Sequence, residues 1–202
     1  MKKFIFVWLA VLLAGFYVFS QVGCGRAQGT ANAPAKSAKT TFLLMVAEQN
    51  IESPQKAWWM SDVNLSTVES ALARKLLESG YEILEPSVIS GQVKADRAFE
   101  RADLQDTDTV KLGKNLNADY VVLGKAVASA GGNVPQSSMR SCFANVTAKV
   151  IRVSDGKVIA YLDAAGSTIH TDVITGGREA LANAGQDLAG KVISAMAQEG
   201  SK

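Results

Sequence analysis

The sequence predicts one small domain of the α/β (α+β) class, a single mixed sheet of about five strands packed by three to four helices. Three observations lead to this class. Strand and helix patterns alternate in the first half of the chain, a long hairpin pattern follows, and an amphipathic helix pattern closes the chain. The 202 residues suit one domain with a sizeable core and are few for two. We expect this single domain over residues 41–198.

The first half of the domain alternates strands and helices. Residues 41–47 are a continuous apolar run, typical of a central strand covered on both faces. Residues 64–80 have an apolar face at helical spacing, a capping-box pair at Ser66 and Glu69, and a stop at Gly80. Residues 48–62 between these two elements are expected as a loop. Further elements are expected as a short strand over residues 81–84, helices over 88–102 and 108–116, and a strand around 120–123.

The second half is dominated by a hairpin. Residues 141–153 alternate between apolar and polar side chains, with one slip of phase near Phe143. The Asp155-Gly156 pair predicts a tight turn at 154–157, because glycine adopts positive φ freely, and residues 158–170 return as the partner strand. A loop over residues 131–136 and a final helix over residues 176–198 complete the expected elements.

The first 24 residues have the order of a bacterial secretion signal or lipoprotein signal. Lys2 and Lys3 precede an uncharged apolar stretch over residues 4–20, and small residues follow around Cys24. A retained membrane anchor stays open, because the stretch is near the lower length limit of a membrane-spanning helix. Residues 25–40 contain small and polar residues without a large apolar side chain, which predicts a flexible linker.

Cys24 is the candidate lipidation site. Val22 and Gly23 suit the positions before the lipid-bearing cysteine of a lipoprotein signal, whereas Gln21 departs from the apolar residue preferred there. Ordinary cleavage after Ala27 is the alternative. In either case we expect an exported, periplasmic protein. A lipid at Cys24 would hold it to the outer membrane, and a retained anchor would also hold it to a membrane.

The charge balance gives no support for binding nucleic acid. The chain has 21 basic and 19 acidic residues, and removal of Lys2 and Lys3 leaves 19 of each. Phosphate-binding loops and metal-ligand spacings are also missing from the sequence, so we expect no cofactor and no metal. The acidic residues near Asp106 are better explained as the start of a helix than as a calcium loop.

No catalytic arrangement stands out, and we expect no enzyme activity. His170 lies near the end of a predicted strand, and neighbours such as Ser167 and Asp172 do not form a triad by sequence proximity, because strand residues alternate faces. Cys142 is expected to be a buried, unreactive thiol.

Trp58, Trp59 and Met60 form the candidate partner-binding segment. Two adjacent tryptophans in a loop do not easily share one core, and tryptophan is common in binding hot spots. The alternative is that the rings cover edges of the core.

The domain resembles a group of bacterial envelope proteins. The residues that carry the resemblance are 117–124 (NADYVVLG), 144–153 (ANVTAKVIRV), 154–160 (SDGKVIA) and 178–182 (REALA). The similar proteins are the middle domain of flagellar assembly protein T, the lipoprotein that activates a penicillin-binding protein, and the curli-secretion lipoprotein. The resemblance covers residues 41–196.

The resemblance implies a non-catalytic assembly, scaffold or regulatory module that binds another envelope protein, in the flagellum in one version. The alternative is an activator of a cell-wall synthase. A secretion-pore subunit is less expected, because the loops at residues 48–62 and 131–136 are short for membrane-inserting hairpins.

Overall fold

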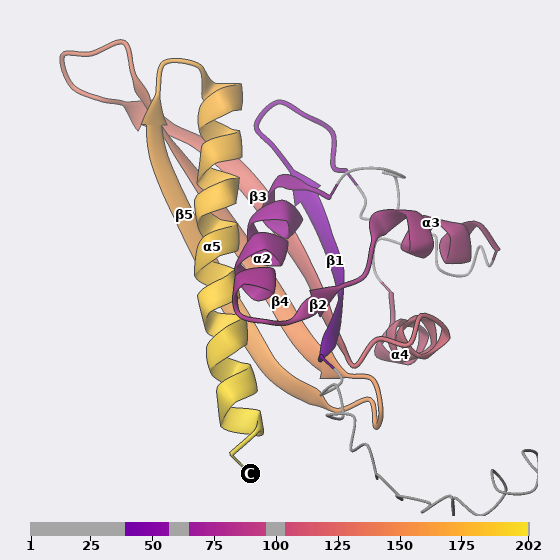
Figure 1. Ribbon diagram of the computed structural model, residues 1–202. Helices are drawn as coiled ribbons and strands as arrows, with labels where there is room; N and C mark the ends of the chain where they lie inside the picture. Colours follow the sequence, from indigo (N-terminus) through magenta and orange to yellow (C-terminus); the bar gives the residue numbers. More distant parts are fainter. Residues whose placement is uncertain (1–38, 57–64, 96–103, 202) are drawn as a thin grey trace, which may run out of the picture. The chain divides into compact units, whose positions relative to one another are not determined.

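The computed structural model describes residues 39–56, 65–95 and 104–201. These residues form one mixed sheet of five strands in the order β2-β1-β3-β4-β5, with four helices (Figure 1), which confirms the predicted fold class. The strands are β1 (Thr41–Gln49), β2 (Glu82–Ile83), β3 (Tyr120–Asn133), β4 (Arg140–Arg152) and β5 (Val158–His170); the helices are α2 (Thr67–Glu78), α3 (Pro86–Ala95), α4 (Asp106–Asn115) and α5 (Val173–Glu199).

β1 lies inside the sheet and pairs in parallel with β2 and β3, whereas β3, β4 and β5 form an antiparallel meander. Residues 42–48 of β1 are all buried, as expected for a strand covered on both faces. The strand runs past the predicted end at residue 47. Its extension is held by two backbone hydrogen bonds between Glu48 and Lys56, of 2.7 and 3.0 Å, so the first part of the predicted loop over residues 48–62 was wrong.

The helices cover the two faces of the sheet unequally. α5 and α2 pack on one face, over a core that includes Phe42, Val122 and Leu188. α3 and α4 pack on the other face around Leu43 and Leu112. They lie beside β1 and the start of β3 (Figure 1), so no described helix covers that face of the distal β3, β4 and β5.

The predicted capping box is present at the start of α2. The Ser66 hydroxyl accepts a hydrogen bond from the Glu69 backbone N–H (3.3 Å), and the Glu69 carboxylate accepts one from the Ser66 N–H (2.9 Å). Gly80 has a φ of 90° and follows the helix end. The predicted start at residue 64 was wrong, because residues 65 and 66 precede the helix and Ser66 is its N-cap, so α2 begins at Thr67.

The predicted loop over residues 131–136 was wrong in its first half. β3 continues through the two glycines to Asn133, with an irregular register between Ala130 and Asn133. The turn follows at residues 134–139, where the Val134 N–H donates to the Met139 carbonyl (2.9 Å). The glycines stay in the strand because the Phe143 ring covers Gly131: its Cε2 atom is 2.6 Å from the place a Cβ would occupy.

Three other boundaries differ from the predictions. The final helix begins at Val173, because the Asp172 carboxylate caps it by accepting a hydrogen bond from the Thr175 N–H (2.8 Å). α3 begins at Pro86, a favoured first helical residue, and its predicted end at residue 102 lies outside the described residues. α4 begins at Asp106 instead of residue 108.

The slip of alternation was predicted near Phe143, but the register shift of the hairpin lies between Val150 and Ile151. Phe143 itself is in regular alternation and lies on the face opposite to Val146. In the described residues, no helix is long and apolar enough to span a membrane.

Candidate protein-binding face

The face of β3, β4 and β5 that no described helix covers (Figure 1) is the candidate functional surface. On β4, the alternate residues Cys142, Ala144 and Val146 are buried in the core beneath α5, so their neighbours point to the opposite side. The strand register aligns these outward residues into rows. We define the open face as the rows Lys125–Thr147–Asp163, Val127–Asn145–Ala165 and Ser129–Phe143–Ser167, with Tyr161 and Ile169 at its ends.

The open face exposes large apolar side chains. Val127, Phe143 and Ile169 lie on a diagonal across the three strands and are 37%, 45% and 55% exposed, and Tyr161 is 78% exposed. Contiguous exposed apolar side chains among polar ones are typical of a surface that binds another protein. Phe143 also covers Gly131, so part of its ring serves the fold.

The charged residues of this face offer specific contacts. Lys125 and Asp163 flank Thr147 in one row, and no described residue forms an ion pair with either side chain. Lys149, in contrast, is paired with Asp106 at the start of α4. A hollow of about 350 Å³ lies over this row and has Lys125, Thr147, Lys149 and Tyr161 among its lining residues. A partner can therefore place groups of both signs against the face.

Two buried carboxylates lie where β1 ends beside α2. One oxygen of Glu69 accepts a hydrogen bond from the Val46 N–H (2.8 Å) and the other accepts from Ser66, while Glu48 accepts from the Val68 N–H (2.8 Å). Burial raises the pKa of Glu69 to about 7, against the lowering effect of its hydrogen bonds. Both oxygens of Glu69 are thus engaged by the backbone, so this carboxyl group serves the fold.

The sequence identified Glu69 as a capping residue but gave no sign of its burial, and Glu48 was assigned to a loop. The candidate residues Cys24, Trp58, Trp59 and Met60 lie outside the described residues, and their roles remain predictions. The open face also escaped sequence analysis, because its rows exist only once the strand register is known.

Within the described part of the chain, His170 does not lie beside a nucleophile and an orienting acid in the arrangement of a catalytic triad. Its Nδ1 accepts a hydrogen bond from the Asp172 N–H (2.9 Å), and the Asp172 carboxylate caps α5. Hydrogen bonds from Thr175 lower the pKa of Asp172. Cys142 is fully buried, as predicted, with its Sγ 3.9 Å from the Val173 carbonyl oxygen. Among the described residues, no group of three His, Cys, Asp or Glu side chains is placed to hold a metal ion.

No protein family matches the chain, and no curated protein matches it either. Similar solved structures include lipoprotein GNA1162 from Neisseria meningitidis, with 16% identity, coverage of 80% of this chain and 98% of that one, and a TM-score of 0.43. The LpoB C-terminal domain from Salmonella enterica has 16% identity, coverage of 66% and 86%, and a TM-score of 0.41. Hypothetical protein CT253 from Chlamydia trachomatis has 12% identity, coverage of 79% and 96%, and a TM-score of 0.46.

Likenesses at these identities and scores assign neither a family nor a function. The expected resemblance to the flagellar and curli proteins is not tested by these three structures and stays a prediction.

Proposed function

We propose that this protein is a non-catalytic binding module of the bacterial cell envelope, and that it docks an envelope partner protein on its open face. The observation that carries the proposal is the open face itself. It combines the exposed side chains of Val127, Phe143 and Tyr161 with the charges of Lys125 and Asp163, which form no ion pair with a described residue, on the face of the strands that no described helix covers. A rigid sheet presents such side chains at fixed spacing, which favours recognition of a protein surface.

The proposed location is the periplasm. The N-terminal order of two lysines, an apolar stretch and small residues supports export, and Cys24 is the proposed lipid-bearing residue. A linker over residues 25–40 would have an end-to-end distance of roughly 20 Å. The protein would therefore act by position: the tether keeps the domain near a membrane, and the domain presents its face to a partner there.

Two partner classes follow from the resemblance described above. The first is an assembly or regulatory role on an envelope machine such as the flagellar basal body. The second is activation of a cell-wall synthase. Roles as a secretion-pore subunit or as an enzyme are weaker proposals.

Site-directed photo-crosslinking in cells tests the face and the partner together. A photoreactive residue at Thr147 on the open face is compared with one at Arg74, an exposed position of α2 on the other side of the sheet. We expect a specific product from Thr147 alone, containing a flagellar component or a cell-wall synthase, and its loss in a Tyr161→Glu variant. Equal products from both positions, or none from Thr147, would contradict the proposal.

A further inference from the structure

α5 carries a row of polar side chains along the free edge of β5. In the described sheet β5 has β4 as its strand neighbour on one side, and its other side faces no strand. Three α5 residues at helical spacing, Asn183, Asp187 and Lys191, lie along this side. We call them the α5 row.

Each residue of the α5 row binds a backbone group of β5. The Asn183 amide donates to the Ser167 carbonyl (3.0 Å), the Asp187 carboxylate accepts from the Ala165 N–H (3.2 Å), and the Lys191 ammonium donates to the Asp163 carbonyl (2.6 Å).

The spacing of the two elements explains this ladder. Four residues of a helix advance about 6 Å, and two residues of a strand advance about 6.5 Å, so the elements stay in step over three contacts. Residues 163, 165 and 167 are two apart, and in an antiparallel strand such residues direct their N–H and C=O groups to the same edge. The α5 row therefore occupies the backbone groups that a further strand would need.

Contacts within the row hold it in this arrangement. The Lys191 ammonium also pairs with the Asp187 carboxylate at 2.8 Å. The hydrogen bond from Lys191 is the main cause of a lowered pKa of Asp187, and the bond from Ala165 adds to it. Asp187 is therefore ionised at neutral pH and accepts from both partners.

Docking of α5 does not depend on this row. The helix buries Ala180, Leu181, Ala184 and Leu188 in the core. It also approaches the backbone of Gly166 so closely that a Cβ there would lie 2.1 Å from the Ala180 carbonyl oxygen. The polar contacts at the strand edge are additional to this packing.

We propose that the α5 row guards the β5 edge against strand addition, and that the strand it excludes is β5 of a second copy of this chain. A second copy offers the same 13-residue strand, which can pair antiparallel with the first about a twofold axis. β5 contains no proline, and Asp163 is its only formally charged residue at neutral pH. A long strand with these properties self-associates when its edge is uncovered. This inference does not depend on the proposed envelope partner.

The test removes the row and measures self-association. The full chain in detergent is compared with an Asn183→Ala, Asp187→Ala, Lys191→Ala variant by sedimentation velocity over a wide concentration range. We expect the variant to shift toward dimer with rising concentration, beyond any association of the wild type. The matched control replaces three exposed α5 residues outside the row, Arg178, Gln186 and Gln198, by alanine and should behave as the wild type.

A second variant identifies the edge. Ala165→Pro added to the triple variant removes an N–H that points away from β4, so it blocks pairing at the edge without breaking the β4–β5 ladder. We expect this variant to return to the wild-type association state. Circular dichroism verifies that each variant is folded. A folded triple variant that associates no more than the wild type, or a dimer that survives Ala165→Pro, would overturn the proposal.

Discussion

The Glu69 carboxylate on α2 accepts a hydrogen bond from the backbone N–H of Val46 in β1, at 2.8 Å, across the buried junction of the two elements. Its second oxygen accepts from the Ser66 N–H at the start of the helix. Glu48, on the same strand as Val46, accepts from the Val68 N–H in the first turn of α2. Two acidic side chains therefore join the end of β1 to the amino-terminal end of α2, where the helix dipole favours negative charge.

This junction predicts a pH dependence of stability. Burial raises the pKa of Glu69 to about 7 in the folded protein, above the ordinary value of 4.5. Between pH 4.5 and pH 7, Glu69 is therefore mostly protonated in the folded state and mostly ionised in the unfolded state. The contribution of Glu69 to the free energy of unfolding is largest below pH 4.5 and is lost as pH rises toward 7, by up to roughly 3 kcal/mol.

Urea unfolding of the wild type and a Glu69→Gln variant between pH 4.5 and 8 checks this prediction. The variant lacks the titrating group, so the difference in stability between the two proteins should change across this window. Glutamine, like the protonated carboxyl group, has one acceptor and one donor, so we expect the wild type to lose stability relative to the variant, by up to roughly 3 kcal/mol, as pH rises from 4.5 to 8. A difference that is independent of pH would contradict the raised pKa.

Two glycines near α5 predict opposite effects of the same substitution. A Cβ at Gly166 would lie 2.1 Å from the Ala180 carbonyl oxygen and 2.4 Å from the Ala184 nitrogen, both backbone atoms that cannot move without displacing the helix. We expect Gly166→Ala to destabilise the domain by about 3 kcal/mol. A Cβ at Gly190, inside α5, meets nothing within 4 Å, so Gly190→Ala should stabilise it by about 0.5–1 kcal/mol.

Thermal and urea unfolding of both glycine variants separates the two outcomes. If Gly166→Ala were as stable as the wild type, the close approach of α5 to β5 would be wrong.

Local signals in the sequence were sufficient for elements whose ends depend on their own residues. Ser66 and Glu69 place the start of α2, Gly80 its end, and Gly156, with a φ of 73°, the β4–β5 turn. Each signal is a short-range hydrogen bond or a backbone conformation that one residue type favours.

Elements whose ends depend on distant contacts were predicted less well. The packing around the start of α5 is an example: the prediction began the final helix at Gly176, but no local signal showed what packs against Gly176 and Gly177. In the structure a Cβ on Gly176 would meet the Cys142 sulfur at 2.6 Å, and one on Gly177 would meet the Asn50 side-chain oxygen at 2.2 Å. The glycines are inside the helix because other segments pack against it there.

The open face was hidden for a related reason. On β4 the large Phe143 is exposed and the small Ala144 and Ala148 are buried, because α5 packs close to the sheet and leaves little space above it. Hydrophobicity alone therefore points to the wrong side of this strand, which explains the slip of phase expected at Phe143. The row of Lys125, Thr147 and Asp163 on the open face depends on the register between neighbouring strands. The alternation of side chains within one strand does not specify this register.

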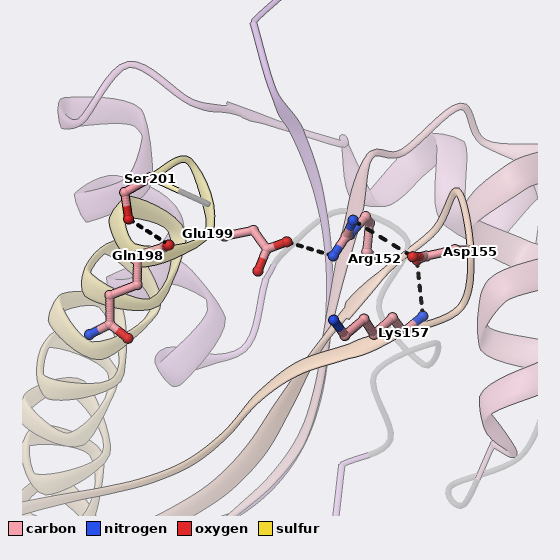
Figure 2. Close-up of polar contacts among 6 residues, drawn as sticks. All are labelled: Arg152, Asp155, Lys157, Gln198, Glu199 and Ser201. Atoms are coloured by element: carbon pink, nitrogen blue, oxygen red, sulfur yellow. Dashed lines mark hydrogen bonds and ion pairs between the residues drawn. The ribbon is translucent and has the colours of Figure 1, made fainter.

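The last prediction concerns an ion pair that ties the carboxyl end of α5 to the β4–β5 turn. Arg152 contacts Glu199 at 2.5 Å and Asp155 at 3.6 Å (Figure 2), and the side chains of Arg152 and Glu199 are 27% and 18% exposed. A glutamate is unfavourable at a helix carboxyl end because of the helix dipole, and the arginine offsets this cost. We expect Glu199→Ala to fray the last turn and to lower the free energy of unfolding by about 1 kcal/mol.

Hydrogen exchange of the Gly200 N–H, which donates to the Met196 carbonyl at 3.0 Å, reports this fraying directly. We expect faster exchange in Glu199→Ala and, because the pair is partly screened, a smaller difference from the wild type at high salt. Lys75→Ala is the matched control, since it removes an ion pair with Glu78 whose side chains are 52% and 58% exposed, and it should leave stability within about 0.5 kcal/mol. Unchanged exchange at Gly200 in Glu199→Ala would show that the buried apolar contacts of α5 alone hold its end.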